Sequence, residues 1–175
     1  MRDGLILRLP TEEDEAQVWA YRQAYADRGE TAAGSSALSA SECFADWLAQ
    51  VRGNFDAATV RPGLMPSHTM LAIRASDGAM VGFIDIRHAL NDHLMNYGGH
   101  IGYSVHPLER RKGYATEMLR QALEFCRTEL KLDRALVTCD ADNEPSRRTI
   151  LSNGGVLEDT RDQGGTPVQR YWIAL

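Results

Sequence analysis

The chain has 175 residues, with 19 lysines and arginines against 24 aspartates and glutamates, and a formal net charge of −5. Its 43% hydrophobic and 25% charged residues are typical of a globular domain and exclude a disordered tail or a collagen-like fibre. A nucleic-acid-binding protein would show a basic excess, and a membrane span would need about 20 consecutive apolar residues. The sequence therefore predicts one cytoplasmic domain over residues 1–175 that binds neither nucleic acid nor membrane.

Apolar periodicity and turn residues predict the elements of the N-terminal half. Thr11 is a suitable N-cap for the helix that follows it, and Asp77-Gly78 is a strong hairpin signal between two β-prone runs. The Gly/Ala/Ser-rich stretch 29–37 is expected to be a flexible loop. The expected elements are a strand over 5–9, a helix over 12–27, a helix opening at the Ser39-x-x-Glu42 capping box, and strands over 69–75 and 80–87.

The C-terminal half shows the strongest helical pattern of the chain. Apolar residues recur at helical spacing from Ala115 to Leu130, directly after a short β-prone run. The expected elements are a strand over 100–105, a helix over 115–130, a strand over 134–139, a helix over 145–153, and closing strands over 156–159 and 168–175. The mixture predicts a single α/β domain whose sheet is largely antiparallel in its N-terminal part.

The segment that joins the strand at 100–105 to the long helix carries the clearest chemical signal. Three cations, Arg110, Arg111 and Lys112, are followed by Gly113, and the helix begins at once. Unpaired N–H groups and a partial positive charge at a helix N-terminus suit an anion such as a diphosphate. A nucleotide-hydrolysing P-loop is excluded because Tyr114 follows the glycine instead of lysine. The alternative is a solvated charged turn with no ligand.

These residues resemble a known family. Arg110-x-x-Gly113-x-Ala115 is similar to the Gln/Arg-x-x-Gly-x-Gly/Ala signature of the GNAT acyltransferases, and 101–105 resembles their fourth strand. The stretches 137–146 and 153–155 resemble their fifth strand and the helix after it, and 169–173 resembles a subgroup of predicted acetyltransferases. The resemblance implies a GNAT-like α/β (α+β) fold with a mixed, mostly antiparallel central sheet of about six to seven strands and about four helices. It also implies binding of acetyl-CoA or coenzyme A.

The resemblance implies roles for the cofactor-binding residues. Backbone N–H groups of the bend would hold the CoA pyrophosphate, and the strand at 103–105 would splay from its neighbour so that the pantetheine arm pairs with it. The Tyr103 N–H would then lie near the thioester oxygen. Asn143 and Ser146 would either contact CoA or cap a helix. The implied cofactor-binding residues are Tyr103, Ser104, Val105, Arg110, Arg111, Lys112, Gly113, Tyr114, Ala115, Thr116, Asn143 and Ser146.

Two proton-transfer roles remain to be assigned, because an attacking amine arrives as ammonium and a thiolate must leave. His100 is the first candidate base, with His88 and Asp85 behind it, and the alternative is that His100 is an ordinary strand-end histidine. The family's tyrosine acid falls on Ile150 here, so Tyr103 or Ser146 would replace it, or the thiolate would leave without assistance.

The resulting prediction is an N-acetyltransferase that moves an acetyl group from acetyl-CoA to a primary amine directly, in a ternary complex. A non-catalytic CoA-binding module is the alternative. The acceptor, a small molecule or a peptide, is not readable from the sequence. The strand 171–175 would either pair across a homodimer or complete its own sheet. Histidine spacing predicts no metal site, and three scattered cysteines suit a reducing compartment.

Overall fold

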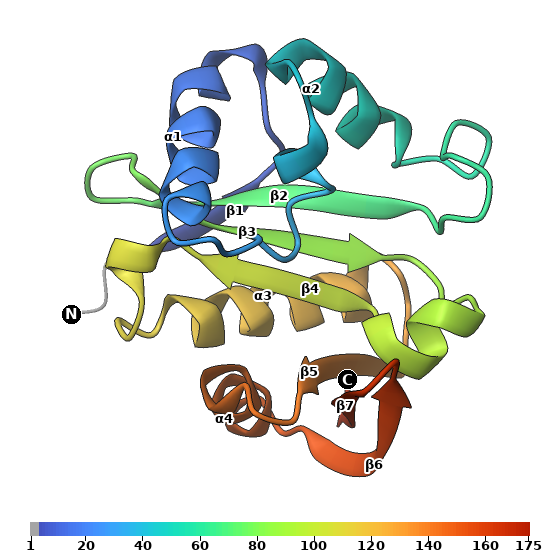
Figure 1. Cartoon of the computed structure of the whole chain (residues 1–175). Coiled ribbons are helices and arrows are strands. Elements are labelled where there is room, and N and C mark those ends of the chain that lie inside the picture. Colours follow the sequence, from blue (N-terminus) through green and yellow to red (C-terminus); the bar gives the residue numbers. More distant parts are fainter. Residues whose placement is uncertain (1–3) are drawn as a thin grey trace.

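Seven strands form two antiparallel sheets in the computed structural model, which describes residues 4–175 (Figure 1). The first sheet has the order β1-β2-β3-β4 and the second the order β5-β7-β6. The strands are β1 (Leu5–Arg8), β2 (Ser67–Arg74), β3 (Met80–Arg87), β4 (Ile101–Val105), β5 (Arg134–Asp140), β6 (Val156–Gln163) and β7 (Thr166–Ala174). The predicted mixed fold with about seven strands is confirmed, with the sheet divided between β4 and β5.

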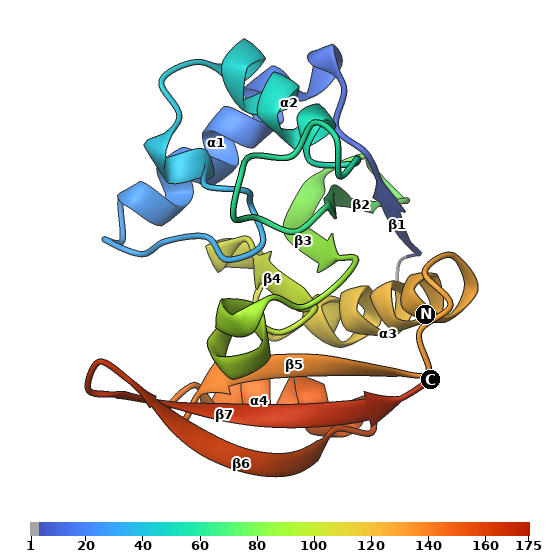
Figure 2. The ribbon, with the colours of Figure 1, turned by 90° about the vertical axis from the view of Figure 1, so that its right-hand side faces the viewer.

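Four α-helices pack against these sheets: α1 (Glu15–Ala26), α2 (Phe44–Gly53), α3 (Tyr114–Thr128) and α4 (Glu144–Ser152). Helices α1 and α2 cover one face of the first sheet, where Trp47 and Phe83 are fully buried. Helix α3 lies between the two sheets, as Figure 2 shows, and buries Met118, Leu119 and Cys126. The burial of Cys126 is what its place on the apolar stripe of α3 predicts.

Short helical turns complete the chain: Glu12–Asp14, Leu38–Ala40 and Pro107–Glu109 are 3-10 turns, and η3 (Leu94–Gly98) is a π-helical turn. The expected helix over 12–27 is therefore a 3-10 turn followed by α1. The capping box predicted at Ser39 is wrong, because Leu38 is buried and anchors a separate turn. Helix α2 begins later, at Phe44, where the Cys43 sulfur accepts the Asp46 N–H.

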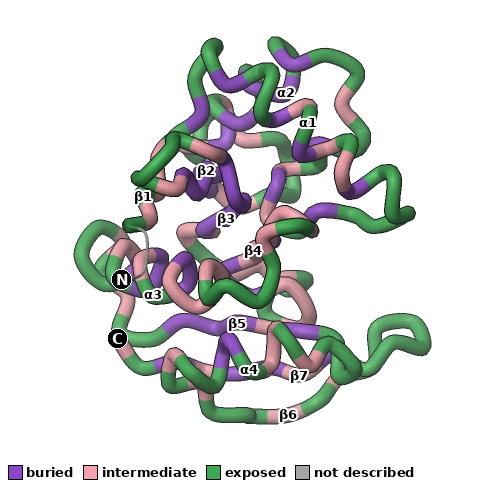
Figure 3. Tube along the Cα trace, turned by 90° about the vertical axis from the view of Figure 1, so that its left-hand side faces the viewer, coloured by how far each residue is buried: buried purple, intermediate pink, exposed green. Residues whose placement is uncertain are grey.

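The second sheet ends in a longer hairpin than the sequence predicts. Strand β6 was expected to stop at 159 but continues to Gln163, and Gly164-Gly165 turns the chain at positive φ into β7. The outer strand β6 is largely exposed (Figure 3), which explains its polar sequence. Since β7 pairs with β5 along 168–174 and with β6 along 166–172, the segment 171–174 lies within its own sheet, one of the two alternatives expected. No helix within residues 4–175 is long and apolar enough to cross a membrane.

Candidate active site

The two sheets meet at one point and part from there. The His100 N–H donates to the Leu136 carbonyl oxygen at 2.7 Å, just before β4 begins. Beyond this contact β4 and β5 belong to separate sheets, and a cleft of about 330 Å³ opens between them. Residues that line it include Gly34, Arg87, Tyr97, Tyr103, Asp140 and Ser146.

The strand register aims backbone groups of β4 into this cleft. Arg87 N–H bonds to His100 O, and His106 N–H bonds to Val81 O, so even-numbered residues of β4 bond to β3. In an antiparallel pair the intervening residues point their N–H and C=O groups the other way. The Tyr103 N–H therefore faces the cleft, as an extended ligand would require. The Val105 carbonyl oxygen is already used, because it accepts the Tyr25 hydroxyl at 2.8 Å.

The loop before α2 also reaches this strand, and its Gly34 lines the cleft. A Cβ on Gly34 would lie 2.3 Å from the Gly102 carbonyl oxygen, so only glycine permits this approach. The stretch 29–37, predicted to be a flexible loop, is thus packed against β4 at Gly34. Ser104, an expected cofactor contact, does not line the cleft, and its side-chain oxygen accepts the hydroxyl of Tyr21 of α1 at 3.0 Å.

The bend before α3 presents free amides. Gly113 is the N-cap residue at φ +88°, and no side chain caps the helix. Arg111 is also left-handed, at φ +65°. Within the described chain, hydrogen bonds are absent from a set of backbone N–H groups in this bend, those of Arg111, Lys112, Gly113, Ala115 and Thr116. Such a concentration of unpaired donors at a helix N-terminus is an anion-binding arrangement.

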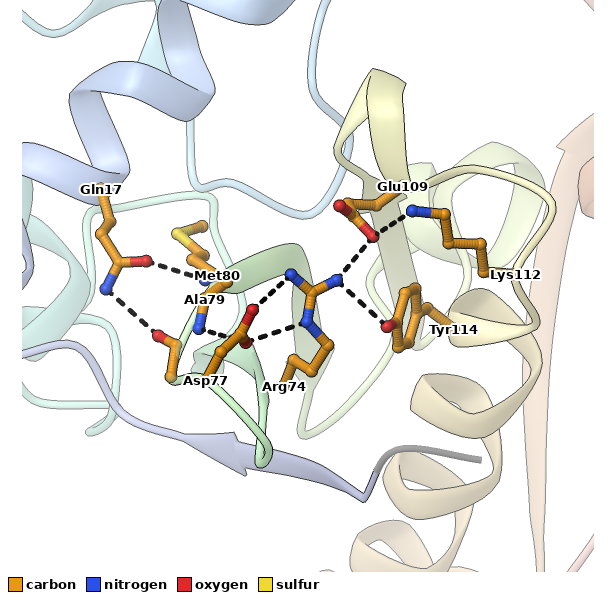
Figure 4. Close-up of polar contacts among 9 residues, drawn as sticks. Gln17, Arg74, Asp77, Ala79, Met80, Glu109, Lys112 and Tyr114 are labelled. Atoms are coloured by element: carbon orange, nitrogen blue, oxygen red, sulfur yellow. Dashed lines mark hydrogen bonds and ion pairs between the residues drawn. The ribbon is translucent and has the colours of Figure 1, made fainter. Parts of the chain in front are cut away.

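The cations of the bend are less free than the sequence suggests. Lys112 donates to Glu109 at 2.9 Å, and Glu109 also accepts from Arg74 at 2.8 Å (Figure 4). The Lys112 ammonium, with Arg74 beside it, lowers the pKa of the Glu109 carboxyl. Arg110 pairs with Glu30. Since Arg111 has no such partner among residues 4–175, the backbone amides and Arg111 carry most of the attraction for an anion.

Tyr114 belongs to the same network. Its hydroxyl oxygen accepts from Arg74 at 3.3 Å, which fixes the first residue of α3 to β2 (Figure 4). Asp77 in the hairpin turn accepts two further bonds from Arg74, at 2.9 and 2.7 Å. Arg74 therefore anchors the bend to the first sheet.

Tyr103 faces α4 across the cleft. Its hydroxyl lies 2.8 Å from the Ser146 hydroxyl oxygen, and burial raises the pKa of Tyr103 to about 12. Burial also raises the pKa of the nearby Cys139 thiol to about 11, so this cysteine is a poor nucleophile. Asn143 caps α4 by accepting the Ser146 N–H at 3.2 Å. Ile150, at the position of the family's tyrosine, is fully buried and has no hydroxyl. The hydroxyl groups of Tyr103 and Ser146 lie at this part of the cleft instead.

His100 does not face the cleft, although it was the first candidate base. The residue is 6% exposed, and its Nδ1 accepts the Leu136 N–H at 3.0 Å. A neutral histidine has one lone pair on its ring nitrogens, and this bond uses it. Burial, together with Arg87, lowers the pKa of His100 to about 4. The geometry therefore favours the alternative role, a buried histidine that joins the two sheets.

The buried His100 should make folding stability depend on pH. Its pKa falls from an ordinary 6.5 to about 4 in the folded chain, so the unfolded chain binds the proton more readily. The contribution of His100 to the free energy of unfolding is fully present above pH 6.5. It falls by about 2–3 kcal/mol as the pH is lowered towards 4. Urea unfolding at pH 7 and 4.5 measures the difference. His100→Asn, which keeps an acceptor, should reduce the difference by this amount, whereas the exposed His93→Asn should leave it unchanged. An unchanged pH dependence in His100→Asn would contradict this assignment.

His88 lies outside the cleft as well. Its Nε2 is 2.7 Å from Nδ1 of His68, and the His68 ring contacts Phe125 of α3. Burial lowers the pKa of both histidines. Asp85 is buried too, accepting from Thr69 at 2.9 Å and pairing with Arg87 at 2.8 Å. None of the three predicted bases, His100, His88 and Asp85, is among the described residues that line the cleft.

The cleft holds a carboxylate that the sequence analysis did not select. Asp140 ends β5 where the sheets have parted, and it is the only acidic side chain among the described lining residues. Asp140 could have been found from the sequence. It ends the run that resembles the family's fifth strand, and that strand is expected beside the fourth. Thr138, two residues earlier, and Arg87 on β3 also line the cleft.

Comparisons with known proteins agree with this geometry. A family model described as "Acetyltransferase (GNAT) domain" matches residues 4–156. The uncharacterized N-acetyltransferase YoaA of Bacillus subtilis (strain 168) is 35% identical over 71 residues, 38% of this chain and 40% of that protein, so the match spans less than half of its length.

Solved structures share the fold over nearly the whole chain. RimJ of Mycobacterium smegmatis, in complex with CoA-disulfide, has a TM-score of 0.73 at 21% identity, covering 97% of this chain and 81% of that one. The ribosomal-protein-S5-alanine acetyltransferase of Vibrio fischeri has a TM-score of 0.71 at 13% identity, covering 97% and 92%. On the strength of the family match, with cleft and bend in agreement, this chain belongs to the GNAT acetyltransferase family.

Proposed function

We propose that this protein transfers an acetyl group from acetyl-CoA to a primary amine, both held at once in the cleft between β4 and β5. The observation that carries the proposal is the uncapped N-terminus of α3, the helix that follows β4, where the backbone amides of the bend named above make no hydrogen bond within the described chain. A dianionic pyrophosphate fits these donors, and an extended arm fits the outward-facing edge of β4. Acetyl-CoA, when bound, supplies an activated acetyl thioester.

The residues of the bend and of β4 bind and orient the donor. Amides of Arg111, Lys112 and Gly113 hold the anionic linkage, and the edge of β4 directs the arm towards Gly102. The Tyr103 N–H is a donor fixed in the sheet, and it stabilises negative charge on a carbonyl oxygen held there without having to reorganise. Holding both reactants in one cleft supplies orientation.

Proton transfer is assigned to the two sides of the cleft. Asp140 accepts the proton of the incoming ammonium, directly or through water, because it is the carboxylate of the cleft and is exposed at the end of β5. Tyr103 and Ser146 hold the proton for the departing thiolate. The raised pKa of Tyr103 keeps that hydroxyl protonated at neutral pH.

Coenzyme A should raise the melting temperature of the wild-type protein, because a ligand that binds only the folded state adds to stability. Acetyl-CoA with an acceptor amine should then release free thiol and give a product heavier by one acetyl group. The acceptors to be tried are spermidine, kanamycin, free amino acids and peptides beginning with serine or alanine. Absence of any shift with saturating CoA would refute the proposal and leave the bend a solvated charged turn.

A CoA-binding module without catalysis is the second candidate, favoured by the buried isoleucine at position 150 where the family has a tyrosine. The two candidates differ in one measurement. Both predict the thermal shift with CoA, but only the enzyme predicts thiol release with an amine.

A further inference from the structure

The π-helical turn η3 (Leu94–Gly98) lies between β3 and β4, beside the point where the two sheets meet. The Gly99 N–H closes it with a bond to the Leu94 carbonyl oxygen at 2.7 Å. The last carbonyl groups of a helical turn have no partner within the turn, so they must bond elsewhere. Two residues of the turn, Tyr97 and Gly98, line the cleft.

One row of side chains on the second sheet satisfies these carbonyl groups. Thr138 of β5, Arg170 of β7 and Asp159 of β6 are cross-strand partners in register. The Thr138 hydroxyl donates to the Tyr97 oxygen at 2.6 Å, and Arg170 Nε donates to the Met95 oxygen at 2.9 Å. Three strands of the second sheet thus contribute to one structure that holds the turn.

The first sheet holds the same turn from its other end. Arg87 of β3 donates from Nη1 to the Gly98 oxygen at 3.1 Å. The next residue, Gly99, lies so close to β5 that a Cβ there would be 2.6 Å from the Leu136 oxygen. The turn η3 therefore ties the two sheets together at the closed end of the cleft.

Arg170 is the most buried of the side chains that hold η3. It is 2% exposed and pairs with Glu158 at 2.5 Å and with Asp159 at 2.7 Å. Buried ion pairs add little net stability compared with apolar side chains of the same size. What Arg170 adds is a fixed place for η3. It is not among the residues that line the cleft, so it touches no ligand held there.

We infer that Arg170 is a positioning residue: by holding η3 across both sheets, it keeps β4 and β5 parted at a fixed width before coenzyme A binds. The inference rests on the proposed function, because the parted strands are the groove assigned to the pantetheine arm. A groove that is already formed spares the ligand the cost of ordering it. The binding of the pantetheine arm should therefore depend on Arg170, whereas the binding of the pyrophosphate, which is assigned to the N-terminus of α3, should not.

Calorimetric titration of Arg170→Met with CoA and with ADP tests this. ADP carries the adenosine and the pyrophosphate but has no pantetheine arm. We expect CoA to bind about tenfold more weakly than to the wild type, while the affinity for ADP changes by less than about twofold. The matched control is Arg134→Met, which removes an arginine stacked on Trp172 of the same sheet, with no bond to η3, and should change neither affinity.

The outcomes separate the inference from the proposed function. Wild-type CoA affinity in Arg170→Met, or an equal loss of CoA and ADP binding, overturns the inference alone. A wild-type protein that binds no CoA overturns the proposed function, and the inference with it. Should Arg170→Met fail to fold, Arg170→Lys carries the test, since it keeps a positive charge beside Glu158 and Asp159 but has a single ammonium group in place of the guanidinium that also reaches the Met95 oxygen. It should weaken CoA binding and spare ADP.

Discussion

Replacing Gly113 with valine is expected to abolish CoA binding while the chain remains folded. Gly113 lies at φ +88°, where a β-branched residue is strained, and its backbone sets the direction of the free amides at the start of α3. The strain costs about 1–2 kcal/mol, because left-handed backbone is unfavourable for any residue with a Cβ. A valine relieves the strain by rotating the peptide groups that the pyrophosphate needs. Calorimetry with CoA and urea unfolding measure the two effects.

Gly78→Val is the matched control. Gly78 lies in the turn between β2 and β3 at φ +72°, and a Cβ there meets nothing within 4 Å, as at Gly113. The two variants should lose similar stability, and Gly78→Val should bind CoA like the wild type. Unchanged affinity in Gly113→Val would show that the amides of the bend do not hold the ligand.

The sequence predicts the bend because its signals are local. A strand, a glycine and a long amphipathic helix follow one another between residues 101 and 128, and each has its own periodicity or conformational preference. The apolar stripe of α3 predicts its burial between the sheets, and Asp77-Gly78 predicts the hairpin. These features depend on neighbours in the chain, so spacing is enough to find them.

The chemistry of the cleft depends on partners far apart in the sequence, and there the prediction from sequence fails. A titratable ring such as His100 is easy to find, but only the fold shows that Leu136 occupies its lone pair. Likewise the charge of Arg110 is visible in the sequence, whereas its pairing with Glu30, 80 residues earlier, is not. The π-helical turn η3 is likewise stabilised by side chains of strands that lie far along the chain.

Removal of the Tyr103 hydroxyl is expected to lower kcat by about 100-fold, the usual contribution of a general acid, with CoA affinity little changed. Its hydroxyl and that of Ser146 are 2.8 Å apart, so Tyr103→Phe and Ser146→Ala should each slow thiol release, and the double variant little more than either. Because the pKa of Tyr103 is raised to about 12, the loss should be the same at pH 7 and pH 9.

Tyr21→Phe is the control for this prediction, since Tyr21 makes the same kind of bond, hydroxyl to Ser104 at 3.0 Å, on the opposite face of β4. It should lose some stability and keep its kcat with the fastest acceptor of the amine panel. If Tyr103→Phe turned over at the wild-type rate, the thiolate would leave without help from this pair, and the buried Ile150 would mark a site that needs no acid. If both tyrosine variants slowed equally, the bonds would serve only to hold β4 in place.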